Sequence, residues 1–347
     1  MNDTYDYYDP FNYTFFDNCT VSDWEDHGVV RVVTLTFYCL TCVLGVPGNA
    51  IVVWTAGVKM KRTVNTTWFL NLAIADLLCC LSIPFTVAEI LLEGHWPYGN
   101  VMCKVLPAVI VLNMFTSVFT LTLIGLDRFI QVVKPVWAQN NRSLGLAWVC
   151  CGVAWALAFL LSLPIMILRE IFTAENYTTC AINFDVQEED PCKEDDVSDS
   201  YRALTLSRFV LGFLIPLLTI MACYGLIAQK VSTKQFRSGR AFRIMVAIVA
   251  AFFLSWLPYH VLGLVDVYGG PQVSRLIRPI DPLVISLAYI NSCMNPVLYV
   301  FMGQDFKEKV KMSLRRIFEK AFSEDGTHSS VNSRGQQSHA TNTSDAL

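Results

Sequence analysis

The composition of this chain excludes an ordinary water-soluble globular domain. Of its 347 residues, 54% are hydrophobic and only 16% are charged, and the formal net charge is −3. Soluble domains contain about 25% charged residues, so we expect most of this chain to lie within a lipid bilayer.

Seven apolar stretches follow one another along the chain, each about 20 residues or longer. They cover residues 32–57, 68–92, 102–133, 145–168, 204–229, 241–265 and 282–303. In a bilayer the backbone must satisfy its own hydrogen bonds, so such stretches cross as helices. The predicted fold is an all-α membrane protein, a seven-transmembrane helix bundle over residues 32–303 with no separate soluble domain.

Charged residues between the stretches are divided unequally between two sets of segments. One set holds sixteen Lys or Arg residues and three acidic residues, and the other holds six and nineteen. The basic segments are 58–67, 134–144, 229–243 and 304–320, and the acidic segments are 1–31, 93–101, 169–203 and 267–281. Because Lys and Arg mark cytoplasmic loops, we expect a multi-pass plasma-membrane protein. Its acidic N-terminal segment 1–31 would be extracellular and its C-terminus cytoplasmic.

The predicted extracellular segments carry signals for modification and for ligand attraction. Aspartates flank Tyr5, Tyr7 and Tyr8, a setting suited to tyrosine sulfation. Sequences for N-glycosylation begin at Asn2, Asn12, Asn18 and Asn176. The acidic field favours a cationic protein ligand, and the alternative is an acidic surface that only aids solubility.

Two cytoplasmic segments are predicted after the seventh span. Residues 304–322 place apolar and basic side chains at helical spacing, which predicts an amphipathic helix lying on the inner membrane surface. Residues 323–347 are rich in Ser, Thr, Asn and Gly, so we expect a disordered tail. Phosphorylation of its serines would create an anionic segment for a basic partner.

Polar residues also occur deep within the apolar stretches. Asp76 lies in the middle of the second span. Other deep polar residues that we expect beside it are Asn113, Ser117, Asn291, Ser292, Asn49 and Asn295. Their oxygen atoms suit a hard cation such as sodium. The alternative is a structural hydrogen-bond network with Asp76 protonated.

Motifs in all seven spans resemble, in order, those of rhodopsin-class G-protein-coupled receptors. They are Gly48-Asn49, Asn71 to Asp76, Asp127-Arg128-Phe129, Trp148, Pro216 with Tyr224, Phe252 with Ser255 to Pro258, and Asn295-Pro296 to Tyr299. The resemblance implies signalling through a heterotrimeric G protein of the inhibitory class, with receptor kinases and arrestin acting at the tail. Such signalling requires no catalytic residue. The sequence shows no set of catalytic residues and no nucleic-acid-binding motif.

The resemblance implies a role for each of these motifs. Arg128 would pair with Asp127 at rest and turn toward Tyr224 and Tyr299 when the sixth span swings outward. The further members of this switch would be Phe252, Trp256, Asn295 and Pro296, with Trp256 directly beneath the ligand. A sodium ion at Asp76 would favour the inactive state.

Cysteines at the outer face are expected to be oxidised. The resemblance implies a disulfide between Cys103, at the top of the third span, and Cys180 in the second outer loop. Cys19 and Cys192 lie outside the family's pattern, and we predict that they form a second pair.

A narrower resemblance joins the chain to the complement anaphylatoxin receptors. Residues 56–87, 95–99, 111–115, 169–173 and 321–324 resemble receptors for component 3a first, with component 5a receptors second and formyl-peptide receptors third. Residues matching Arg169, Arg208 and Asp281 engage the ligand's C-terminal arginine and carboxylate in that family, and we add Tyr259. From the sequence alone, Arg208 either points into the bundle or extends toward the membrane surface.

Two other functional classes are compatible with a bundle of membrane helices: a transporter and a decoy receptor. A transporter of this kind predicts internal repeats and helices interrupted at the membrane midplane, and we find no repeat. A decoy receptor binds its ligand without signalling, and loss of the Arg128 position would favour it, yet Arg128 is present. The signalling receptor is therefore the preferred hypothesis.

Overall fold

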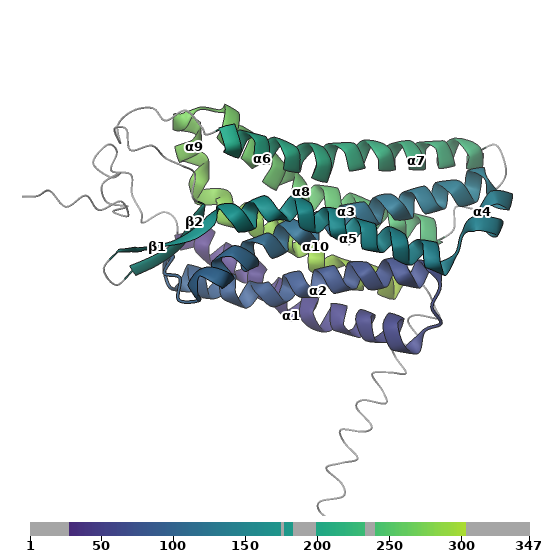
Figure 1. Cartoon of the computed structure of the whole chain (residues 1–347), viewed down its shortest axis with the longest axis horizontal. Helices are drawn as coiled ribbons and strands as arrows, with labels where there is room; N and C mark the ends of the chain where they lie inside the picture. Colours follow the sequence, from purple (N-terminus) through teal and green to yellow (C-terminus); the bar gives the residue numbers. More distant parts are fainter. Residues whose placement is uncertain (1–27, 175–176, 183–198, 233–239, 303–347) are drawn as a thin grey trace, which may run out of the picture. The chain divides into compact units, whose positions relative to one another are not determined.

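Seven long helices lie alongside one another in the structure, a computed structural model that describes residues 28–174, 177–182, 199–232 and 240–302. They are α1 (Gly28–Trp54), α2 (Val64–Leu91), α3 (Gly99–Val133), α5 (Leu144–Leu168), α6 with α7 (Asp199–Phe209 and Ile215–Ser232), α8 (Arg240–Tyr268) and α10 (Asp281–Met302). Figure 1 shows the β1–β2 hairpin at one end of this bundle and the short helix α4 at the other.

The seven helices match the seven predicted spans in order. Six helical segments among the described residues are long and apolar enough to cross a membrane, and α10 packs as the seventh helix against α1 and α8. The fifth span starts at Asp199 rather than at residue 204, because α6 extends outward beyond its apolar part. Helix α3 lies against α2, α5 and α7 and forms the centre of the bundle.

The bundle buries polar side chains and exposes apolar ones. Asn49, Asp76 and Ser292 have no exposed surface, whereas Leu254 is 70% and Ile167 is 68% exposed. In water this distribution would be unfavourable, but in a bilayer the apolar side chains contact lipid while the polar ones bond to one another. The polar interior therefore lies in the space enclosed by the helices.

Close helix contacts explain two glycines in α1. A Cβ atom at Gly45 would lie 2.4 Å from Cys80 Sγ in α2, and one at Gly48 would lie 3.0 Å from Pro296 Cβ in α10. A larger residue at either position would require the Cys80 side chain or Pro296 to shift. Small residues in this way allow membrane helices to pack at short distance.

Prolines and π-helical turns interrupt the regular hydrogen bonding of the spans. Pro216 follows the π-helical turn η4 (Val210–Leu214), which joins α6 to α7 as one span. A second π-helical turn, η3 (Thr55–Lys59), ends α1. Prolines also lie inside α1, α2, α3, α5, α8 and α10. Each proline removes one backbone donor, so the helix can bend there.

The second outer loop forms an antiparallel hairpin that the sequence did not predict. Strands β1 (Arg169–Ala174) and β2 (Tyr177–Ile182) pair with Ile171 opposite Cys180. A disulfide joins Cys180 to Cys103 in α3, and the Trp96 amide donates to the Thr178 carbonyl at 2.6 Å. The hairpin is therefore fixed to α3 and to the loop between α2 and α3, above the centre of the bundle.

On the opposite end, a short helix follows α3 directly. Helix α4 (Pro135–Asn141) begins with proline at its first position, where no backbone donor is needed. Helix α5 begins after Ser143, whose hydroxyl accepts a hydrogen bond from the Leu146 amide. A last short helix, α9 (Pro271–Ile277), and the 3-10 turn η5 (Arg278–Ile280) connect α8 to α10 at the outer end.

Candidate functional site: outer charged residues and an inner switch

Arg208 points into the bundle from the outer end of α6. Its Nη1 donates a hydrogen bond to the Tyr259 hydroxyl in α8 at 2.7 Å, and its Nε donates to the Leu204 carbonyl at 3.3 Å. The contact with α8 supports the inward orientation over the one toward the membrane surface. A guanidinium fork is suited to binding a carboxylate through parallel hydrogen bonds.

Arg169 is the first residue of β1 and lies above the same region. Its Nη1 donates to the Cys180 carbonyl at 3.2 Å, and its buried Nε has no hydrogen-bond partner among the described residues. Burial lowers the pKa of this guanidinium, nearby Glu89 and Tyr259 raise it, and Arg208 lowers it. Tyr259 thus lies within electrostatic range of both arginines. A buried donor without an acceptor is unfavourable, and a ligand carboxylate would supply one.

Acidic groups accompany these arginines at the outer end. Asp281 is the first residue of α10, is exposed, and lies within electrostatic range of Arg208 and Asp266. Asp266 in α8 accepts a hydrogen bond from the Tyr201 hydroxyl of α6 at 2.8 Å. Asp281 makes no ion pair within 4.0 Å to the described residues. The outer end therefore offers both cationic and anionic groups to a ligand that carries both charges.

An aromatic layer lies directly below Tyr259. Trp256 and Phe252 are each 1% exposed, and their rings lie 6.1 Å apart. The Trp256 ring also meets that of Tyr259 edge-on at 5.5 Å and that of His260 at 6.4 Å. Movement of Tyr259 would be transmitted to these packed rings, because close-packed interiors do not deform freely.

The predicted deep polar residues form a hydrogen-bonded set below the aromatic layer. Asn295 donates to Asp76 Oδ2 at 2.7 Å, Asn113 donates to Ser292 Oγ at 2.9 Å, and Ser117 donates to Asn113 Oδ1 at 3.3 Å. The other oxygen of Asp76, Oδ1, is buried without a hydrogen-bond partner. These contacts join α2, α3 and α10.

Two further predicted deep polar residues, Asn49 and Asn291, differ in whether they join this hydrogen-bonded set. Asn49 in α1 donates to the Ser292 carbonyl at 2.8 Å, so it belongs to the same set. Asn291 is buried, but its Nδ2 has no hydrogen-bond partner among the described residues. The structure therefore does not bond Asn291 to the other members, although it follows directly before Ser292.

The charged groups at the inner end are paired differently from the prediction. Asp127 Oδ1 lies 2.7 Å from Arg142 Nε, while Arg128 Nη2 donates to the Asn65 side-chain oxygen at 3.0 Å. The expected ion pair between Asp127 and Arg128 is thus wrong for this structure. Tyr224 lies within electrostatic range of Arg128, as the predicted switch requires. Tyr299 lies in α10, and its side chain falls outside the described part.

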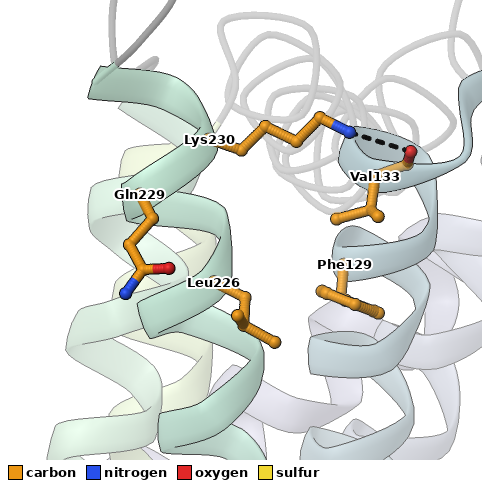
Figure 2. Close-up of a pocket in the computed structure, with 5 residues that line it drawn as sticks. All are labelled: Phe129, Val133, Leu226, Gln229 and Lys230. Carbon is orange, nitrogen blue, oxygen red and sulfur yellow. Dashed lines mark hydrogen bonds between the residues drawn. The ribbon is translucent and has the colours of Figure 1, made fainter.

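A shallow cavity of about 370 Å³ opens between α3 and α7 beside these charges. Phe129, Val133 and Leu226 line it with Gln229 and Lys230 (Figure 2). Lys230 reaches from α7 to donate to the Val133 carbonyl at 3.0 Å. The Phe129 ring, directly after Arg128 in the sequence, therefore lies against this cavity.

Several predicted sites lie outside the described residues. They are the sulfation and glycosylation sites Tyr5, Tyr7, Tyr8, Asn2, Asn12, Asn18 and Asn176, the cysteines Cys19 and Cys192, and the segments 304–322 and 323–347. These remain predictions.

Sequence reasoning missed or misplaced three functional residues. Trp148, the predicted motif residue of the fourth span, is 39% exposed, whereas Trp155 in the same helix donates from Nε1 to Asn71 Oδ1 of α2 at 3.0 Å. Arg142 and Asn65 belong to none of the motifs of the seven spans. No local pattern marks their contacts, since each partner is distant in the sequence.

Comparison with known proteins agrees with this arrangement. Residues 48–299 match the 7 transmembrane receptor (rhodopsin family) profile. The chain is 61% identical to the C3a anaphylatoxin chemotactic receptor of Danio rerio, over 90% of this chain and 83% of that one, and 56% identical to that of Oncorhynchus mykiss, over 98% and 92%. It is also 38% identical to C5a anaphylatoxin chemotactic receptor 1 of Homo sapiens, over 90% of each chain.

These findings confirm the predicted seven-helix membrane fold and the disulfide between Cys103 and Cys180. They also separate the chain from enzymes and transporters, because the match covers almost the whole helical bundle, from Gly48 to Tyr299. The chain belongs to the rhodopsin family of seven-transmembrane receptors.

Proposed function

We propose that this receptor binds the complement fragment C3a at its outer pocket and signals from the plasma membrane through a heterotrimeric G protein of the inhibitory class. Two relatives that are more than half identical over most of their length bear the name of C3a receptors. The observation that carries the proposal is that Arg208 is hydrogen-bonded to Tyr259 and that Arg169 lies within electrostatic range of both. Signalling then leads to chemotactic and inflammatory responses.

The chemistry of the pocket suits a ligand that ends in arginine. The terminal carboxylate would accept hydrogen bonds from Arg208 and Arg169, and the terminal guanidinium would approach Asp281. Groups of opposite charge would thus bind both charged groups of one ligand residue, which gives specificity. The acidic outer loops would steer a cationic protein to this pocket.

Signal transmission requires only that the agonist bind one conformation better than the other. Contact at Tyr259 would shift Trp256 and Phe252, and the movement of α8 would open the inner end for the G protein. Receptor kinases and arrestin would then act on the segment 323–347. Binding of C5a is the second candidate function, because the human C5a receptor is 38% identical.

A calcium or cyclic-nucleotide readout in transfected cells tests the ligand. C3a is expected to give a response, whereas C3a without its C-terminal arginine is expected to lose at least about a hundredfold in potency, since a buried ionic contact disappears. C5a and a formyl peptide serve as comparison ligands. Equal potency of C3a with and without the arginine would contradict the proposed pocket, and a stronger response to C5a would favour the second candidate.

The deep polar residues fit a sodium ion. Asp76 Oδ1 and Asn49 Oδ1 are buried without hydrogen-bond partners, and the hydroxyl of Ser117 and the amide of Asn113 lie in the same set. A bound cation would supply positive charge to the Asp76 carboxylate, which a buried site otherwise disfavours. Helices α2, α3 and α10 would be held in their present arrangement, which favours the inactive state.

Asp76→Asn is expected to abolish the effect of sodium on agonist affinity. In wild-type membranes, labelled C3a should bind about fivefold or more weakly in sodium chloride than in an equal concentration of a large organic cation. Asparagine lacks the negative charge, so the two affinities should become equal. Ser162→Ala removes a buried hydroxyl of α5 and is the control. A sodium effect that persists in Asp76→Asn would instead support a purely structural network.

A further inference from the structure

Both carboxylate oxygens of Asp127 bond to residues other than Arg128. Arg142 Nε lies 2.7 Å from Oδ1, and Arg142 Nη2 donates to Oδ2 at 3.2 Å. Gln131 also donates to Oδ2, at 2.7 Å. Two parallel bonds from one guanidinium are the strong form of arginine–carboxylate pairing. The anionic group nearest in sequence to Arg128 is therefore occupied by a loop arginine.

Arg128 is held by a neutral acceptor. Its Nη2 donates to Asn65 Oδ1 at 3.0 Å, and its buried Nε has no hydrogen-bond partner among the described residues. Arg142 Nη2 donates to the same Asn65 oxygen, at 2.6 Å. One amide oxygen therefore receives two guanidinium groups. Bonds to a neutral amide are weaker than those to a carboxylate, so Arg128 is held less firmly than an ion pair with Asp127 would hold it.

The local fold places Arg142 in reach of Asp127. The chain turns after α3, forms α4, and reaches Arg142, whose amide donates to the Ala138 carbonyl at 3.0 Å. Ser143 immediately caps α5, so Arg142 is held between two helices. The side chains of Arg142 and Asp127 are 27% and 12% exposed. Partial shielding from water makes such a pair stronger than an exposed one.

We infer that Arg142 is a positioning residue that keeps Asp127 away from Arg128 and so lowers the barrier to signalling. Asp127 can pair with either guanidinium, and the geometry shows it paired with Arg142. Arg128 then needs to break only its bond to Asn65 before turning toward the inner cavity. Arg142 thereby determines how much signalling occurs without agonist. Asn65 accepts a hydrogen bond from both arginines at the same oxygen.

Arg142→Gln tests this role through agonist-independent nucleotide exchange. Membranes containing the full chain and an inhibitory-class G protein would be assayed with a non-hydrolysable GTP analogue, per receptor at the cell surface. Asp127 freed from Arg142 should pair with Arg128, so exchange without agonist is expected to fall about fivefold. Arg142→Lys keeps one cation for Asp127 and should lie between wild type and Arg142→Gln. Lys134→Gln removes a neighbouring exposed loop charge and should equal wild type.

The double variant separates this role from direct contact with the G protein. In an Asp127→Asn background, Arg142→Gln should have no further effect, because there is no carboxylate left to release. An equal fall in both backgrounds would overturn the inference, as would equal results for Arg142→Gln and Lys134→Gln. Since the inference rests on the proposed G-protein coupling, a wild-type chain that gives no exchange even with C3a would overturn both. If wild type responds to C3a but Arg142→Gln shows the same agonist-independent exchange as wild type, the inference alone is wrong and the proposed coupling stands.

Discussion

Arg208→Ala is expected to abolish high-affinity C3a binding. Arg208 is the inward-facing guanidinium at the outer end of α6 and is hydrogen-bonded to Tyr259. Loss of one partner from a buried charge pair costs about 2–5 kcal/mol, or roughly thirtyfold or more in affinity. Part of this loss is the cost of leaving the ligand carboxylate buried without a donor. Competition with labelled C3a on intact cells measures it directly.

Matched variants show whether charge or packing is lost. Arg208→Lys keeps a cation but not the fork, so an intermediate affinity is expected. Tyr259→Phe removes only the hydroxyl that orients Arg208, and a smaller loss is expected. Lys104→Ala removes a cation from the outer part of α3 and serves as the control. If Arg208→Ala binds C3a as wild type does, Arg208 is not part of the ligand site.

Cys103→Ser is expected to remove functional receptor from the cell surface. The disulfide to Cys180 closes a loop with a sequence separation of 77 residues and fixes the hairpin that begins at Arg169. Loss of such a bond typically costs about 2–5 kcal/mol. Arg169 would also lose its fixed position, since it donates to the Cys180 carbonyl. Surface antibody staining and C3a binding should both fall severalfold.

The paired serine variants identify the bond itself as the cause. Cys180→Ser and the double variant should match Cys103→Ser, because each removes the same bond. Cys39→Ser alters a free, exposed cysteine of α1 and should behave as wild type. A double variant that is markedly worse than either single variant would show that the two cysteines have separate roles.

The helical spans were predictable because the bilayer imposes one simple requirement. A backbone that satisfies its own hydrogen bonds and an apolar surface of sufficient length are both local properties. The described helices therefore follow the predicted stretches closely. The β1–β2 hairpin was not predicted, because its stability depends on the disulfide at Cys180 and on the contact with Trp96. The residues that make these contacts, Cys103 and Trp96, are far from the hairpin in the sequence.

The outer candidate site was predicted as a set of residues but not as an arrangement. The resemblance to anaphylatoxin receptors pointed to Arg169, Arg208, Asp281 and Tyr259 one by one. The structure places Tyr259 in contact with Arg208 and within electrostatic range of Arg169. It also adds Asp266, held by Tyr201, which no motif marked.

The inner switch shows the opposite case, in which a motif gave the right residues and the wrong partners. Asp127 and Arg128 are neighbours in the sequence, and the family resemblance pairs them. In the structure Asp127 pairs with Arg142, and Arg128 bonds to Asn65. Neighbouring residues on a helix point in different directions, so which acceptor each side chain meets depends on what the adjacent helices and loops present.

The membrane fold and the family could be predicted from the sequence, because hydrophobic length and the order of motifs are linear properties of a chain. Which charged groups are paired at each end of the bundle depends instead on how the helices and loops are arranged in space. Guanidinium and carboxylate groups bind strongly at about 3 Å and compete for the same partners. Small differences in loop path therefore select one pairing over another, as the position of Arg142 after α4 does for Asp127.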